Sequence, residues 1–146
     1  MQDRYAGDVG DFLKFGLLRA LGDGAPPLKL GVNWYLTGDE SHNADGKHVG
    51  YLQPGTTYHA SLRSCDPDLM SRLAQVVSAD RSVAALEESG VLPVDSVTYA
   101  ARLVDGMGDS ARRAWHRDAL RSSRRSCSMP PTTPVTLTTI SGQSSS

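Results

Sequence analysis

The sequence predicts an α/β fold in which helices cover a mostly parallel β-sheet. Segments with apolar residues at helical spacing alternate with short β-prone segments, in the order helix, strand, helices, strand, helix. Strands that are separated by helices usually pair in parallel, and the helices then pack on the faces of the sheet. The 146 residues are also an ordinary length for one domain with one hydrophobic core.

The first predicted element is a helix over about residues 9–21. Apolar residues at helical spacing define its predicted buried face: Val9, Phe12, Leu13, Leu17, Ala20 and Leu21. Asp8 can accept hydrogen bonds from the first free amides, and Gly22 suits the left-handed residue that closes a helix. Gly10 and Gly16 each cost up to about 1 kcal/mol relative to alanine, which indicates close packing there.

A largely buried strand is predicted over residues 28–36, because the run Leu-Lys-Leu-Gly-Val-Asn-Trp-Tyr-Leu is short, β-prone and mostly apolar. The strand pattern ends at Thr37 and Gly38. The next stretch, residues 39–47, is polar and rich in turn-forming residues. We therefore expect a loop that leaves the carboxyl end of this strand.

Three helices and one further strand are predicted in the second half of the chain. Asp66 followed by Pro67 signals a helix to about Ser78, with an apolar face formed by Leu69, Met70, Leu73, Val76 and Val77. A short helix over residues 82–89 and a strand over residues 94–103 follow. The last helix spans residues 109–120, and its candidate inward residues are Ala111, Trp115, Ala119 and Leu120.

The composition changes abruptly near the end of the chain. We expect one incomplete α/β domain over residues 1–122 and a disordered tail over residues 123–146. From Ser126 onward the chain has no charged residue and is dominated by Ser, Thr and Pro, so little apolar surface offsets the entropy of ordering. The abrupt onset suggests truncation or a shifted reading frame after about Arg125.

Charge and cysteine content exclude several classes of function. The net charge of −1 gives no general electrostatic reason for tight nucleic-acid binding. A local basic stretch remains as a candidate contact surface: Arg112, Arg113, His116, Arg117, Arg121, Arg124 and Arg125. Cys65 and Cys127 have no metal-ligand or redox spacing, and no signal peptide or membrane span is present. These observations predict a soluble, cytoplasmic protein without a structural metal; its oligomeric state is left open.

The densest group of polar residues lies in the loop after the first strand. Its candidate metal ligands are Asp39, Glu40, His42, Asp45 and His48, and His42 or His48 could also transfer protons. Ligands of open α/β sheets bind beyond the carboxyl ends of strands, where this loop should lie. Carboxylates and imidazoles can hold a divalent ion or transfer protons near neutral pH, although no defined metal motif is matched. The alternative is a solvated polar turn.

A second candidate group lies at the start of the first helix. Asp11 and Lys14 are three residues apart and share a helix face, and the free amides after Asp8 could receive an anionic or carbonyl group. The alternative is a helix cap plus one surface ion pair of little energetic value. The dinucleotide-binding, P-loop and serine-hydrolase motifs are absent from the sequence.

Two segments carry a resemblance to known families. They are Gly-Asp-Val-Gly-Asp-Phe-Leu-Lys-Phe-Gly-Leu-Leu-Arg-Ala-Leu at residues 7–21 and Gly-Val-Asn-Trp-Tyr-Leu-Thr-Gly-Asp-Glu-Ser-His-Asn-Ala-Asp-Gly-Lys-His at residues 31–48. The chain resembles an uncharacterised family of longer bacterial proteins, closely over about residues 2–52 and more faintly to residue 120. That family continues into a strand ending in Asp-Pro-Asp-Asn-Gly, which this chain lacks, so the resemblance also implies truncation.

More distantly, the opening is similar to the large-subunit ribosomal RNA adenine-N6 methyltransferases, which begin with Gly-Asn-x-x-Asp-x-Leu-Lys-His before the first Rossmann strand. The positions that match are Gly7, Asp11, Leu13 and Lys14, with Asp8 in place of Asn and Phe15 in place of His. The resemblance implies a partial Rossmann-like, methyltransferase-like parallel sheet that binds S-adenosylmethionine. The family's glycine-rich loop and its Asp-Pro-Pro-Tyr-type catalytic motif have no counterpart here.

The resemblance implies roles for particular residues. It implies that Asp11 and Lys14 are pocket residues and that residues 39–45 form the cofactor loop. Together with the proton-transfer candidate His42, the predicted catalytic residues are Asp11, Lys14 and His42. The predicted cofactor-binding residues are Gly7, Asp8, Thr37, Asp39, Glu40, Asn43 and Asp45. The first functional hypothesis is therefore a methyltransferase-like fragment that acts, in its complete form, on nucleic acid. The second is a metal-dependent phosphoesterase or nuclease that uses Asp39, His42, Asp45 and His48 to activate water. A third is a non-enzymatic interaction module.

Overall fold

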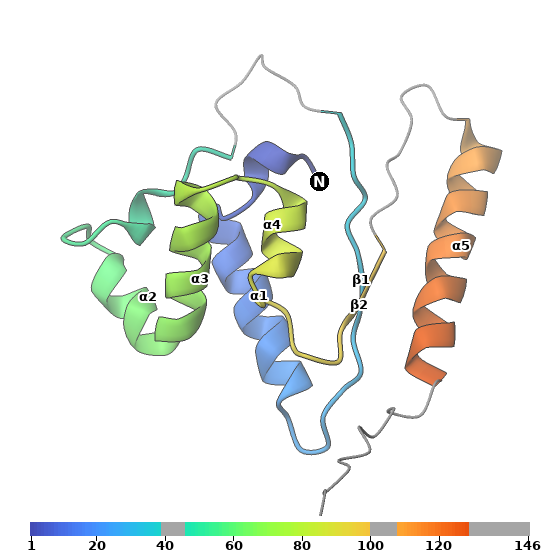
Figure 1. Ribbon diagram of the computed structural model, residues 1–146, viewed down its shortest axis with the longest axis horizontal. Coiled ribbons are helices and arrows are strands. Elements are labelled where there is room, and N and C mark those ends of the chain that lie inside the picture. The colour runs from blue at the N-terminus through green and yellow to red at the C-terminus, as the bar shows by residue number, and fades with distance from the viewer. Residues whose placement is uncertain (39–45, 100–107, 129–146) are drawn as a thin grey trace, which may run out of the picture.

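The computed structural model describes the backbone of residues 1–38, 46–99 and 108–128, and the side chains of these ranges as far as residue 122 (Figure 1). Two short 3-10 helices, five α-helices and two strands make up these described ranges. In chain order they are η1 (Asp3–Tyr5), α1 (Val9–Gly22), β1 (Gly31–Asn33), η2 (Gly50–Leu52), α2 (His59–Cys65), α3 (Pro67–Ser78), α4 (Val83–Glu88), β2 (Val97–Tyr99) and α5 (Asp109–Ser128).

The two strands form a parallel pair at the centre of the molecule. Gly31 pairs with Val97 and Asn33 with Tyr99, although α2, α3 and α4 separate the strands in sequence. Helices α1 to α4 lie on one side of the strands and α5 lies on the other (Figure 1). This arrangement confirms the predicted α/β class and parallel pairing.

Strand β1 is shorter than the sequence predicts, and β2 begins at Val97 instead of residue 94. Strand β1 has three residues, whereas the prediction covered residues 28–36. Tyr35 has a φ of 45°, a left-handed value that an extended strand cannot accommodate, so the ladder ends after Trp34, whose amide donates to Tyr99 O. The predicted strand over residues 94–103 is described only as far as Tyr99.

Helix α3 agrees with its prediction. The side chain of Asp66 accepts a hydrogen bond from Leu69 N at 2.9 Å, and Pro67 occupies the first helical turn, where its missing amide hydrogen costs nothing. Four of its five predicted apolar residues are buried: Leu69, Met70, Leu73 and Val76. Helix α4 is likewise capped by Ser82, which accepts from Ala85 N at 3.1 Å.

The predicted buried face of α1 is largely wrong. Phe12 is buried as expected, but the other members of that face are exposed: Val9, Leu13, Leu17, Ala20 and Leu21. The core instead receives Asp11, Phe12 and Phe15. Phe12 packs edge-on against Tyr51 and Phe15 against Trp34, each with ring centroids 6.1 Å apart. Burial of these large aromatic rings fixes the rotation of the helix.

Gly22 also differs from its prediction, because it continues the helix instead of adopting a left-handed conformation. Helix α1 is followed by Asp23, whose φ of −90° is right-handed. A Cβ atom at position 22 would lie 2.5 Å from Pro93 Cγ, so glycine permits close contact with the chain that leads into β2. Gly10 and Gly16 have no comparably close neighbour from another element.

The last helix is longer than predicted, and helix α2 was not predicted. Trp115 and Ala119 are buried as expected, whereas Ala111 and Leu120 are exposed. Trp115 contacts Tyr35 and Tyr99, with ring centroids 4.5 and 5.6 Å away. Helix α5 includes residues 123–128, which were assigned to the tail; residues 129–146 lie outside the described ranges.

None of the described helices is long and apolar enough to cross a membrane.

Candidate functional site

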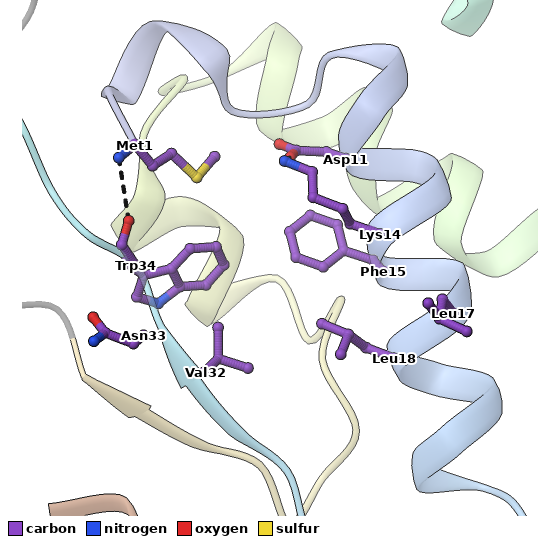
Figure 2. A pocket seen from close by; sticks show the side chains of 9 residues that line it. All are labelled: Met1, Asp11, Lys14, Phe15, Leu17, Leu18, Val32, Asn33 and Trp34. Atoms are coloured by element: carbon purple, nitrogen blue, oxygen red, sulfur yellow. Dashed lines mark hydrogen bonds and ion pairs between the residues drawn. The ribbon is translucent and has the colours of Figure 1, made fainter. Parts of the chain in front are cut away.

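A pocket of about 350 Å³ lies between α1 and the carboxyl end of β1 (Figure 2). It is lined by Met1, Asp11, Lys14, Phe15, Leu17, Leu18, Val32, Asn33 and Trp34. Figure 2 shows the Asp11 and Lys14 side chains meeting at one end of the pocket, with Val32 and Leu18 at the other. The pocket therefore combines apolar walls with one acid–base pair and one amide, a composition typical of small-molecule sites.

The turn that precedes α1 positions Asp11. Gly7 has a φ of 78°, and a Cβ atom there would lie 2.4 Å from Val77 Cγ2, so only glycine fits between the turn and α3. Gly7 N donates to Asp11 Oδ2 at 2.8 Å, and Asp8 Oδ1 accepts from Asp11 N at 3.1 Å. Asp8 thus caps the helix as predicted, and the same turn holds the aspartate carboxylate by a backbone amide.

The buried Tyr51 hydroxyl also stabilises the turn that precedes α1. It donates to Gly7 O at 3.2 Å and to Asp8 O at 3.4 Å. Burial, followed by the charges of Asp11 and Asp8, raises the pKa of Tyr51 well above its ordinary value. The phenol therefore stays protonated and remains a hydrogen-bond donor.

Asp11 is the buried charged group of the site. Its side chain is 0% exposed, and Lys14 Nζ lies 2.6 Å from Oδ1. The Lys14 ammonium is therefore the charged partner of this carboxylate. Burial raises the pKa of Asp11, while Lys14 and the Gly7 amide oppose the increase. The interpretation as a surface ion pair is therefore wrong for the aspartate, although Lys14 itself is exposed.

Strand β1 and the amino-terminal residue form the facing wall. Trp34 is buried, and its indole Nε1 donates to Glu87 Oε1 on α4 at 2.5 Å, which fixes the ring against Phe15. The Met1 amino group donates to Trp34 O at 3.2 Å (Figure 2). Asn33 places the one uncharged polar side chain in the pocket lining. An asparagine within an otherwise apolar strand segment was the available sequence signal, and the predictions missed it.

Residues 39–45 lie outside the described ranges, but the residues on either side are held near the start of α1. Gly38 O accepts from Gln2 Nε2 at 2.8 Å, and Gly46 O accepts from the Arg81 guanidinium. His48 O accepts from Val9 N at 3.1 Å. Both ends of this segment are thus anchored near residues 2–9, next to the turn that positions Asp11.

The predicted site residues divide into three groups. Asp11 and Lys14 line the pocket. Gly7 and Asp8 lie outside the lining and position Asp11, while Thr37 is half-buried and donates its amide to Met1 O at 3.0 Å. Residues outside the described ranges are Asp39, Glu40, His42, Asn43 and Asp45, and their assignments stay predictions. The structure therefore brings Asp11 and Lys14 together with pocket residues that were not predicted.

Among the residues that the structure describes, no group of three His, Cys, Asp or Glu side chains could hold a metal ion. Three of the four proposed hydrolase ligands, Asp39, His42 and Asp45, lie outside those residues, so that hypothesis stays untested. The predicted basic surface is present on α5 in part, since Arg112, Arg113 and Arg117 are exposed. No family model, curated protein or solved structure matches the chain.

Proposed function

We propose that the pocket between α1 and β1 binds S-adenosylmethionine, and that the chain is a methyltransferase-like, Rossmann-like domain that acts on nucleic acid. The observation that carries this proposal is the pair of buried Asp11 and exposed Lys14 on α1, in a pocket beside the carboxyl end of a parallel strand, where α/β folds of this kind bind their ligands. A pocket of about 350 Å³ is within the usual range for small-molecule sites.

The residues present fit the polar and apolar parts of such a cofactor. The Asp11 carboxylate is paired with Lys14 at 2.6 Å, so a ligand ammonium could pair with this carboxylate where it displaces the exposed Lys14. The exposed Lys14 can pair with a carboxylate, and Phe15, Leu18 and Val32 offer an apolar surface to a nucleoside. When bound, the cofactor supplies an activated methyl group; the protein contributes binding and orientation.

Isothermal titration calorimetry of the full chain with S-adenosylmethionine tests this proposal. We expect Asp11→Asn and Lys14→Met to weaken binding at least about tenfold each, since a hydrogen bond to a charged group contributes about 1.5–3 kcal/mol. Lys29→Met is the matched control, because Lys29 precedes β1 at the opposite end of the strand. Absence of binding by the folded wild-type chain at roughly millimolar cofactor, or equal affinities for Lys14→Met and wild type, would overturn the proposal.

A further inference from the structure

Helix α1 carries an apolar stripe on the side that faces away from the core. We define the α1 stripe as Val9, Leu13, Leu17 and Leu21, which recur every fourth residue and therefore form one ridge along the helix. Leu13 and Leu17 are 64% and 61% exposed, and the two end residues are exposed as well. Leu28 extends the patch, since its amide donates to Leu21 O at 3.1 Å and its side chain is exposed.

A contiguous patch of this kind differs from scattered surface leucines, which are common in globular proteins. The opposite side of α1 already packs against α3, and its Phe12 and Phe15 contact Tyr51 of η2 and Trp34 after β1. Within the described ranges, the side chains of the α1 stripe stay solvent-exposed after all this packing. The stripe therefore has the composition of an interface.

The spacing of the stripe is symmetric about the middle of the helix. Val9 and Leu21 are each six residues from Phe15, and Leu13 and Leu17 are each two residues from it. An isologous two-fold interface needs this property, because residue i of one copy must contact residue j of the other and the reverse. In an antiparallel pair of α1 helices, Leu13 meets Leu17 of the other copy and Val9 meets Leu21.

The available area fits a dimer of modest affinity. The four stripe residues and Leu28 together expose an apolar patch on the order of 400 Å², a size that on monomers often marks a functional surface. A standard interface buries about 800 Å² per partner, so the apolar patch supplies roughly half and its polar surroundings would supply the rest. We therefore expect dissociation in the micromolar range.

The stripe is also continuous with the pocket. Leu17 belongs to both, and Lys14 lies one turn away on the pocket side. We propose that α1 is the interface of a homodimer in which two α1 helices pack antiparallel about a two-fold axis between Leu13 and Leu17. The second copy then lies along the Leu17 rim of each pocket. This proposal does not depend on the identity of the pocket's ligand.

Sedimentation velocity of the full chain over roughly 1–300 µM tests the dimer. We expect a concentration-dependent monomer–dimer equilibrium that Leu13→Glu and Leu17→Glu each weaken at least tenfold. Leu120→Glu on α5 is the matched control, since Leu120 is also an exposed leucine on a helix and lies outside the stripe. Leu17→Gln repeats the test without the added charge if a glutamate variant fails to fold.

Cysteine cross-linking tests the register. In a Cys65→Ser, Cys127→Ser background, a mixture of Leu13→Cys and Leu17→Cys chains should form a mixed disulfide faster than either variant alone, because an antiparallel pair brings those positions together. A chain that stays monomeric throughout the concentration range, a dimer that the stripe variants leave unchanged, or cross-linking without preference for the mixed pair would overturn the proposal.

Discussion

Helices α1 and α3 begin with the same capping hydrogen bond, but they differ in whether the predicted apolar face is buried. Each starts at an aspartate whose carboxylate accepts the amide three residues on, Asp8 in one and Asp66 in the other. The predicted apolar face of α3 is in the core, whereas most of the predicted face of α1 is exposed. A capping signal thus holds in both helices, but an apolar pattern identifies the buried face in only one.

The difference follows from what occupies the opposite face of each helix. The other side of α3 carries Asp68, Ser71 and Arg72, so only one orientation buries apolar surface. Helix α1 has apolar residues on both sides, and the side with Phe12 and Phe15 contacts Tyr51 and Trp34. Where two faces compete, the one that finds partners elsewhere in the chain is buried.

The largest expected effect is the difference in stability between truncating a buried leucine of α3 and truncating an exposed leucine of α1. Leu73→Ala should lower the free energy of unfolding by about 2–5 kcal/mol, because Leu73 is fully buried and its truncation leaves a cavity. Leu17→Ala should change the stability of the monomer by less than about 0.5 kcal/mol, since its side chain is already exposed. Urea denaturation at a protein concentration of about 1 µM, where the proposed dimer dissociates, measures both. Equal losses for the two variants would contradict this account of α1.

A smaller effect is expected at Gly7, which lies in the turn before α1 and packs against Val77 of α3. Gly7→Ala should cost about 1–3 kcal/mol, because it adds a clash with Val77 Cγ2 to the strain of a positive φ. Gly55→Ala is the matched control, since Gly55 has a φ of 88° but no atom near its would-be Cβ. Thermal denaturation of the pair isolates the clash. Equal melting temperatures for the two variants would show that α3 does not constrain the turn.

The smallest expected effect distinguishes the buried acid of α1 from the exposed Asp68 of α3. A raised pKa means that folded Asp11 binds its proton more tightly than unfolded Asp11, so the charged form opposes folding. The stability of wild type relative to Asp11→Asn should be constant at pH values below the ordinary aspartate pKa of 3.8. It should fall as the pH rises through the raised pKa.

Urea denaturation between about pH 2 and pH 8 measures this dependence. The matched variant Asp68→Asn should show the opposite slope. Its neighbours Arg72 and Arg19 lower the pKa of Asp68 to about 2. The pairing therefore stabilises the fold at pH values above the ordinary aspartate pKa, and this stabilisation is lost as the pH falls through about 2. Because Asp68 is exposed, its change should be small. A wild-type chain that gains stability over Asp11→Asn with rising pH would show that the Lys14 pairing outweighs burial.

Two of the nine residues that line the candidate site could be predicted from the sequence as site residues. Asp11 and Lys14 were identified because a helix start and a three-residue spacing are visible locally. Asn33 and Trp34 were missed as pocket residues, because their position depends on how β1 packs against α1. The burial of Asp11 was missed for the same reason, since it requires Tyr51 and Val77 to close around the preceding turn.

The sequence by itself determined the features that arise from contacts within a few residues: the caps at Asp8 and Asp66, the proline start of α3, the single apolar face of that helix and the α/β order of the elements. Only the tertiary structure decided which face of α1 is buried, where β1 ends and which side chains meet in the pocket. Capping and periodicity depend on hydrogen bonds and spacing inside one helix, whereas burial depends on partners that are tens of residues away in the chain.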